Sequence, residues 1–194
     1  NLDSGKVIAT VEAHNAAITS MSFSSRNNIL VTTSMDKTAR IWVVDLGLLD
    51  DGAKAVTAEN INPLTLCRLI PFKGVPMMCV MPPATSHVGS GSKDEAVCVV
   101  VENEGGEGKV HAIDAIAGRI LQTLQGLDKL GKLAQKLGVN NLSSIASLGV
   151  KAATMSKGKK AKKIAVASMA FKDDGRQLYV SLTSGIVLAV AFNG

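Results

Sequence analysis

The chain has 194 residues, enough for one sizeable domain or for part of a larger one. Hydrophobic residues make up 46% of it and charged residues 19%, as in a globular protein, but aromatic residues make up only 3%, so aliphatic side chains must fill the core. No apolar run is long enough to cross a bilayer, and residues 1–7 lack the pattern of a signal peptide. We therefore expect an intracellular protein, cytoplasmic or nuclear, with no membrane association.

The positive charge is concentrated in one segment. The chain carries a net charge of +5, yet residues 126–163 contain nine lysines and a single acid, Asp128. That segment therefore has a charge of +8, and the remainder of the chain sums to −3. The basic character belongs to this segment and not to the core.

The three cysteines, Cys67, Cys79 and Cys98, form no CxxC pair. An odd number of thiols at these spacings fits neither a disulfide framework nor a zinc site. We expect reduced thiols that pack in the core, and no metal or other cofactor.

The first expected elements lie within residues 1–70. Residues 1–12 predict a turn at Ser4-Gly5 and then a strand over residues 7–11. Residues 45–63 predict a loop with one helical turn over residues 53–59. Elsewhere in residues 1–70, apolar and polar residues alternate with strand period in four runs. These runs predict strands over 18–23, 29–34, 38–43 and 66–70, the first three of them separated by short polar turns.

Four residues punctuate this unit at informative positions: His14 before the first run, Ser34 at the end of the second, Asp36 in the tight turn, and Trp42 six residues later. An Asp in a turn can accept hydrogen bonds from backbone N–H groups and from an imidazole, which can bridge through a hydroxyl to an indole N–H. The pattern resembles a WD40 repeat, with Ala-His in place of Gly-His and Trp-Val in place of Trp-Asp. The resemblance implies that these four residues hold a blade together and do not perform acid–base catalysis.

The resemblance implies an all-β fold of WD40-type β-propeller blades, about three four-stranded antiparallel sheets that form part of a larger propeller. In that family each sequence repeat supplies the outer strand of one blade and the three inner strands of the next. The strand over residues 7–11 is then the outermost strand of a preceding blade.

A second unit predicts strands over 77–81, 96–101, 109–114 and 119–124. Residues 102–108 are rich in glycine, but they lack the Lys-Ser/Thr ending of a phosphate-binding loop and precede no helix, so a hairpin loop is expected. The unit has no set equivalent to His14, Ser34, Asp36 and Trp42, so we expect hydrophobic packing alone to hold it. His87 and His111 are isolated and are expected in a loop and on a strand surface.

A third unit begins near Ile164. Residues 165–171 resemble residues 17–23 almost residue for residue, which is the clearest internal repeat in the chain. A turn over residues 172–176 and strands over 177–182 and 186–192 follow, without a fourth strand.

These units divide the chain into blades at 1–125, the first at about 7–70 and the second at about 77–125, an insertion at 126–163, and a further blade at 164–194 that lacks its outer strand. Three blades are too few to close a propeller, because known rings have about four to eight. A longer natural chain, a dimer of half-rings and blades lent by a partner protein would each explain the count, and we favour the first.

The insertion has helical and basic parts. Residues 127–137 place four leucines and Ala134 on one stripe at helical spacing, and Asn140-Asn141 can cap a second helix over residues 142–155. Strand order puts the insertion on the same rim as Met35, Asp36 and residues 102–108. The candidate partner-binding residues are Met35, Leu127, Leu130, Leu133, Leu137, Lys157, Lys159, Lys160, Lys162 and Lys163.

The sequence favours a non-enzymatic scaffold that binds other protein subunits of an assembly through the blade rim and residues 126–163. The alternative is an RNA-associated component of a ribonucleoprotein or ribosome-assembly complex, in which Lys157–Lys163 contacts RNA or an acidic protein surface. A solvated linker is an equal interpretation of those lysines. A hydrolase is disfavoured because the chain has no G-x-S-x-G or H-E-x-x-H motif, and no small-molecule substrate is expected.

Overall fold

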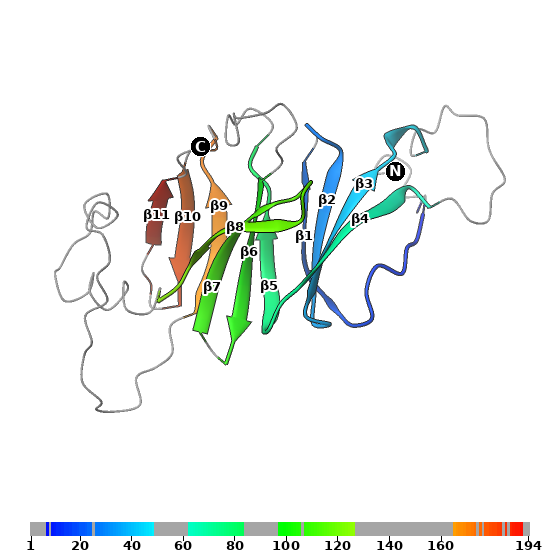
Figure 1. The fold of residues 1–194 in the computed structure, drawn as a ribbon. Coiled ribbons are helices and arrows are strands. Elements are labelled where there is room, and N and C mark those ends of the chain that lie inside the picture. The colour runs from blue at the N-terminus through cyan, green and yellow to red at the C-terminus, as the bar shows by residue number, and fades with distance from the viewer. Residues whose placement is uncertain are drawn as a thin grey trace, which may run out of the picture.

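The structure is a computed structural model that describes residues 7, 9–24, 26–48, 62–83, 97–105, 107–126, 165–173, 175, 177–183, 185 and 187–191. These residues form three antiparallel sheets (Figure 1). Sheet 1 contains β1 (Ile18–Ser24), β2 (Ile29–Ser34), β3 (Thr38–Val44) and β4 (Leu64–Pro71), and a short 3-10 helix, η1 (Leu46–Leu48), follows β3. Sheet 2 contains β5 (Val75–Val80), β6 (Val97–Glu104), β7 (Glu107–Asp114) and β8 (Arg119–Leu124), and sheet 3 contains β9 (Val166–Phe171), β10 (Gln177–Leu182) and β11 (Val187–Ala191).

Each sheet is a meander in which neighbouring strands pair in sequence order. The all-β fold class predicted from the sequence is confirmed, and the described residues form two antiparallel sheets of four strands and one of three, as expected for propeller blades. The alternating pattern sets the register, since a slip by one residue would turn every apolar side chain of a strand to the opposite face. In β2, for example, Ile29 and Val31 are buried on the face that meets sheet 2.

Two predicted elements differ from the structure. Residues 7 and 9–11 are not in a strand, and Val7 is 74% exposed, because no described strand lies beside this segment to pair with it. The hairpin loop expected over residues 102–108 is also much shorter, since β6 continues to Glu104 and β7 begins at Glu107. Gly105, with a φ of 59°, makes this tight connection possible because glycine has no Cβ to clash in that conformation.

Sheets 1 and 3 are built alike. The N–H of Met35 bonds to the carbonyl of Ala17 at 2.9 Å, and the N–H of Thr183 bonds to the carbonyl of Ala165 at 2.9 Å. A side-chain hydroxyl of β2, that of Thr33, donates to the Ser20 carbonyl at 3.4 Å, as the Ser181 hydroxyl of β10 does to the Ser168 carbonyl at 3.3 Å. Each of these residues of sheet 3 lies 148 positions after its counterpart in sheet 1, so the repeat seen in the sequence extends to the hydrogen-bonding register.

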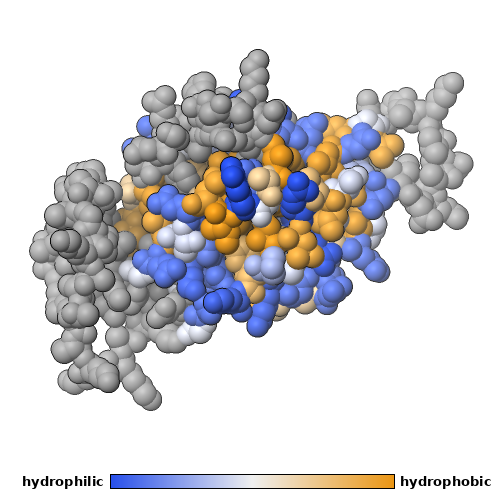
Figure 2. Space-filling model, viewed as in Figure 1, coloured by the Kyte–Doolittle hydropathy of each residue, from blue (hydrophilic) through white to orange (hydrophobic). Residues whose placement is uncertain are grey.

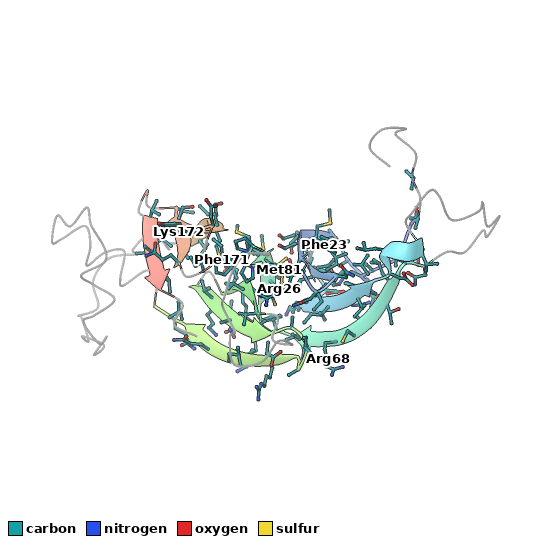
Figure 3. The ribbon with its side chains drawn as sticks, turned by 90° about the horizontal axis from the view of Figure 1, so that it is seen from above. Phe23, Arg26, Arg68, Met81, Phe171 and Lys172 are labelled. Carbon is teal, nitrogen blue, oxygen red and sulfur yellow. The ribbon has the colours of Figure 1, made fainter. Side chains whose placement is uncertain are left out.

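Seen from above, the sheets form a crescent, with Phe23, Met81 and Phe171 along the concave side and Arg68 on the convex side (Figure 3). Two hydrophobic cores fill the spaces between sheets. One joins sheet 1 to sheet 2 and includes Val31, Ile41, Cys98 and Ile113. The other joins sheet 2 to sheet 3 and includes Val99, Val101, Leu178 and Val180.

Hydrophobic side chains also gather over the middle of the convex face, where β4 and β8 lie (Figure 2). Leu66 and Leu69 of β4 and Ile120 and Leu121 of β8 are each between 45% and 50% exposed.

Candidate functional site

A chain of side-chain hydrogen bonds joins the segment before β1 to the centre of sheet 1. Trp42 Nε1 donates to Thr32 Oγ1 at 2.9 Å, Thr32 Oγ1 lies 2.8 Å from His14 Nε2, and His14 Nδ1 lies 2.9 Å from Asp36 Oδ2. A neutral imidazole with its proton on Nδ1 satisfies every partner, because Nε2 then accepts the threonine proton. The His14 side chain has no exposed surface. This series of hydrogen bonds therefore fixes residues 13–15 on sheet 1.

Asp36 is the anchor of this network. It accepts hydrogen bonds from the Thr38 hydroxyl at 2.6 Å, from the Thr38 N–H at 3.0 Å and from the Asn15 N–H at 3.2 Å, besides that of His14. Burial by itself would raise the pKa of Asp36, but these donors outweigh it and hold the pKa well below its usual range. Arg40 Nη2 adds a weaker ion pair at 3.7 Å.

The bridging hydroxyl belongs to Thr32 and not to Ser34, the residue expected from the motif. Trp42 pairs with Leu30, so Thr32 lies two residues further along the same face of β2 and Ser34 lies four. Four residues of a strand span roughly 13 Å, which is beyond the reach of the indole N–H. Ser34 instead closes the turn: its hydroxyl accepts from the Asp36 N–H at 3.0 Å and lies 3.2 Å from the Ala16 carbonyl.

Sheet 2 has a polar network of its own, which was not predicted from the sequence. His111 Nε2 lies 2.9 Å from Glu102 Oε2, and His111 Nδ1 lies 2.9 Å from Thr123 Oγ1. Glu102 also accepts the N–H of Gly74 at 2.5 Å, in the connection between β4 and β5. The ring of Phe72 packs on His111, with 5.4 Å between ring centroids.

Two expectations are therefore wrong. His111 is 5% exposed and is not a surface residue, and sheet 2 is not held by hydrophobic packing alone. β6 continues into the expected loop and includes Glu102, which is 4% exposed. Glu102 pairs with Lys109, which lies two residues before His111 and on the same face of β7. Burial would raise the pKa of Glu102, but hydrogen bonds from Gly74 and His111 lower it, and the charges of His111 and Lys109 act in the same direction. The signal was the two-residue spacing of each strand: Val100 and Glu102 share one face of β6, and Val100 pairs with His111, so the Glu and the His lie on the same face of the sheet.

The two networks perform the same task with different residues. The network of sheet 1 ties the segment before β1 to β2 and β3. The network of sheet 2 ties the segment before β5 to β6, β7 and β8. Val100 of β6 is equivalent to Thr32 of β2, because Val100 pairs with Cys79 of β5 as Thr32 pairs with Met21 of β1. Glu102 and Ser34 each lie two residues further along, so they occupy equivalent positions. Both networks therefore fix the connections that lead into the inner strands.

One edge of the crescent, which we call the turn rim, contains residues 35–37 between β2 and β3, residues 72–74 between β4 and β5, and Gly105 between β6 and β7 (Figure 1). Met35 is 57% exposed there. Lys37 and Lys73 are also exposed, and the Phe72 N–H bonds to the Lys37 carbonyl at 2.9 Å, so the two lysines lie on adjoining backbone segments. The turn rim thus presents one apolar and two cationic side chains on a backbone that the two buried networks hold in place.

Lys37 has a φ of 65°, in the left-handed region that non-glycine residues rarely occupy. The equivalent residue of sheet 3, 148 positions later, is Gly185, with a φ of 83°. Both turns are closed by the same backbone hydrogen bond: the Lys37 N–H bonds to the Ser34 carbonyl at 3.2 Å, and the Gly185 N–H bonds to the Leu182 carbonyl at 2.9 Å. A lysine at a position that suits glycine costs stability, and such outliers are typical of functional sites.

The other candidate partner-binding residues, at 127–163, lie outside the described residues, as do His87 and the helical turn expected over 53–59. Cys67, Cys79 and Cys98 are free. Burial raises the pKa of the Cys79 thiol to about 11 and raises the pKa of Cys98 further, so both thiols stay protonated and unreactive at neutral pH.

The part of the chain that the structure describes contains no group of three His, Cys, Asp or Glu side chains that could hold a metal ion. Within the same residues, no helix is both long and apolar enough to span a membrane.

Comparison with known proteins gives one result. Residues 5–43 match the family model described as WD domain, G-beta repeat. The match covers the segment that carries His14, Thr32, Asp36 and most of β3. The search of curated proteins gives no match.

Proposed function

We propose that this chain, which carries a WD40 repeat at residues 5–43, is a non-enzymatic scaffold that binds other protein subunits of an assembly through its turn rim. WD40 repeats generally serve as protein-interaction scaffolds and are typically non-catalytic. The single observation that carries the proposal is Lys37: an exposed lysine holds a strained backbone conformation where the equivalent turn of sheet 3 uses glycine.

The chemistry of the rim defines the partner segment that would fit it. Met35 offers a flexible apolar contact, and Lys37 and Lys73 offer two cations on adjoining backbone segments. A protein segment with acidic side chains on either side of an apolar residue would satisfy all three. The carboxylate of Asp36 is engaged by Thr38 and His14 inside the protein and is not part of the contact proposed for such a segment. Residues 126–163, with the stripe of Leu127, Leu130, Leu133 and Leu137, are proposed to add a second contact for the same partner.

Substitution of Lys37 separates binding from stability. Lys37→Gly should remove a cation from the rim and relieve the left-handed strain, so the variant should unfold at an equal or higher urea concentration while losing partner binding at least about tenfold. Partners would be recovered from the source organism with the full-length protein as bait and identified by mass spectrometry. Lys172→Ala, on the opposite edge of the crescent, is the matched control and should retain them.

Two results would contradict this assignment. If Lys37→Gly retains every partner at unchanged salt sensitivity, the rim cation is not used. If deletion of residues 126–163 leaves the partner list unchanged, the insertion has no docking role.

A second candidate function rests on the charge of +8 in residues 126–163. We propose, as the alternative, that Lys157–Lys163 contacts RNA in a ribonucleoprotein or ribosome-assembly complex. RNA held by lysines should dissociate steeply as salt rises, with a slope set by the number of phosphates neutralised, whereas a partner held by the leucine stripe should not. Sequencing of RNA recovered at low and high salt from the wild type and from a variant with these five lysines changed to Ser distinguishes the two.

We propose an intracellular location, cytoplasmic or nuclear. The three free cysteines support a reducing compartment. Imaging of the tagged full-length protein tests the location, and a secreted or surface-exposed signal would overturn it.

A further inference from the structure

A β-bulge turns Arg68 of β4 toward sheet 2. Leu66 pairs with Trp42 and Arg68 pairs with Ile41, so Cys67 is an extra residue in this outer strand. Without the bulge, Arg68 would lie on the same face of β4 as Leu66. With it, Arg68 lies on the face of Ile41, which belongs to the core between sheets 1 and 2. The arginine therefore faces the neighbouring sheet.

A second bulge turns Ile120 of β8 toward sheet 1. Ile120 pairs with Ile113 and Gln122 pairs with Ala112, so Leu121 is the extra residue in this outer strand. Ile113 belongs to the core between sheets 1 and 2, so Ile120 lies on the side of sheet 2 that faces sheet 1. Ile120 is nevertheless 46% exposed, and Leu121 is 50% exposed. The two bulges thus place an arginine and an isoleucine on facing sides of the boundary between β4 and β8.

Arg68 reaches across this boundary to the turn before β8. A Cβ built on Gly118, which has a φ of 72°, would lie 2.9 Å from Cδ and 3.1 Å from Cγ of Arg68, so the arginine stem lies directly on this glycine. Arg119 is the next residue, and its side chain is 68% exposed. Two arginines from different sheets therefore lie around one glycine. We call the surface formed by Arg68, Gly118, Arg119, Ile120 and Leu121 the outer seam.

The outer seam carries an excess of positive charge. Nη1 of Arg68 donates to the Cys67 carbonyl at 2.8 Å, and no acidic side chain of the described residues forms an ion pair with Arg68. Nε of Arg119 lies 3.4 Å from Oδ2 of Asp114. The other oxygen of Asp114 accepts two backbone N–H groups, and Asp114 is only 6% exposed. One buried carboxylate thus faces two exposed guanidinium groups.

The surroundings of these cations are apolar. Hydrophilic residues interrupt the hydrophobic surface over β4 and β8 in Figure 2, and Arg68 projects from the convex side in Figure 3. A guanidinium group binds a carboxylate through two parallel hydrogen bonds, and arginines among apolar side chains are typical of the centres of protein interfaces. RNA would instead require a continuous cationic track, which two arginines among aliphatic side chains do not provide.

We propose that the outer seam binds a protein segment in which an acidic residue is flanked by aliphatic residues. The carboxylate of that segment accepts hydrogen bonds from Arg68 and Arg119, and its aliphatic neighbours pack on Ile120 and Leu121. The outer seam lies between two described sheets, so a sheet added beside sheet 1 or sheet 3 would continue the crescent and leave the seam uncovered. It is also separate from the turn rim, so the proposal is independent of the role given to Lys37.

Selection of short random peptides on the full-length protein tests the proposal. It should yield a class of peptides with Asp or Glu between aliphatic residues, whose dissociation constants rise at least about tenfold with Arg68→Gln and with Arg119→Gln. Arg26→Gln is the matched control, because it removes an exposed arginine from the turn between β1 and β2. This variant and Lys37→Gly should bind the same peptides as the wild type does. Fluorescence anisotropy with the selected peptides measures each dissociation constant.

Charge reversal gives a second measurement. Arg68→Glu should abolish binding of the acidic peptides and should bind the same peptides with Lys in place of the acid. Circular dichroism shows whether the variant is folded, and Arg119→Glu serves if Arg68→Glu is not. The proposal is overturned if no selected peptide depends on Arg68 or Arg119, or if peptides with Gln or Asn in place of the acid bind equally well. Single-stranded RNA that binds through the two arginines while no peptide does would also overturn it.

Discussion

At the scale of single residues, the polar network of sheet 1 depends on where the hydroxyl groups lie along β2. Thr32 and Ser34 lie on the same face of β2, yet Thr32 alone is within reach of both His14 Nε2 and Trp42 Nε1. Ser34 closes the turn instead. The two hydroxyls should therefore differ in their contribution to stability.

Thr32→Val should lower the free energy of unfolding by about 2–4 kcal/mol, because a buried imidazole nitrogen and a buried indole N–H lose their partner together. Ser34→Ala should lower it by about 1 kcal/mol, the typical worth of a neutral hydrogen bond. Urea denaturation followed by Trp42 fluorescence measures both. A larger loss for Ser34→Ala than for Thr32→Val would refute the assignment of the bridging hydroxyl.

The carboxylates of Asp36 and Glu102 make folding sensitive to acid. Both have a pKa below the usual carboxyl range in the folded protein, so the stability that they contribute is complete above about pH 4.5 and is lost as pH falls toward their folded pKa. Unfolding free energy should decrease from pH 5 to pH 2. The double variant D36N/E102Q should be less stable at pH 7 but should show a flatter dependence over this range, measured by denaturant titration at each pH.

At the scale of elements, sheet 1 is joined to sheet 2 through a short connection, residues 72–74, that a buried network fixes. Gly74 lies in the connection between β4 and β5, and a Cβ built there would meet the Asn103 carbonyl oxygen and the Cα of Glu104. Only a residue without a side chain allows the backbone to approach β6 closely enough for the Gly74 N–H to reach Glu102.

Gly74→Ala should lower the free energy of unfolding by about 2–3 kcal/mol, because the backbone must move and Glu102 loses a donor. Gly105→Ala is the comparison: its Cβ would meet nothing within 4 Å, so only the positive φ of 59° opposes it. That change should cost about 1 kcal/mol. Equal losses in the two urea titrations would mean that the close approach to β6 does not matter.

At the scale of the whole molecule, three sheets are held in a crescent by apolar cores and by hydroxyls that cross from one sheet to the next. Ser22 is the clearest of these, since it accepts the N–H of Met81 at 2.9 Å. The bond adds direction to a contact that is otherwise non-directional, and so fixes how far one sheet slides along its neighbour.

Ser22→Ala should lower the free energy of unfolding by about 1–2 kcal/mol, because the buried Met81 N–H is left unpaired. Thr65→Ala on the exposed side of β4 should change it by less than about 0.5 kcal/mol. Both are measured at one fixed protein concentration, because association would add to stability. A neutral effect of Ser22→Ala would show that water replaces the hydroxyl and that the contact is not closed.

The sequence by itself determined the strands and their grouping. Strand period and turn residues depend on neighbours in the chain, so the bounds of β2, β8 and β10 were predicted to the residue, and the repeat at 165–171 correctly marked the register of sheet 3. The positions of His14, Asp36 and Trp42 followed from the motif for the same reason.

Only the tertiary structure decided which side chains meet. The choice of Thr32 over Ser34 depends on the pairing of Trp42 with Leu30, and the burial of Glu102 and His111 depends on the contact with the connection at Phe72 and Gly74. The strand expected over residues 7–11 failed to form because strand pairing requires a neighbour that local sequence cannot supply. Local pattern fixes the period of an element, whereas the partner of each buried polar group is set by residues far away in the chain.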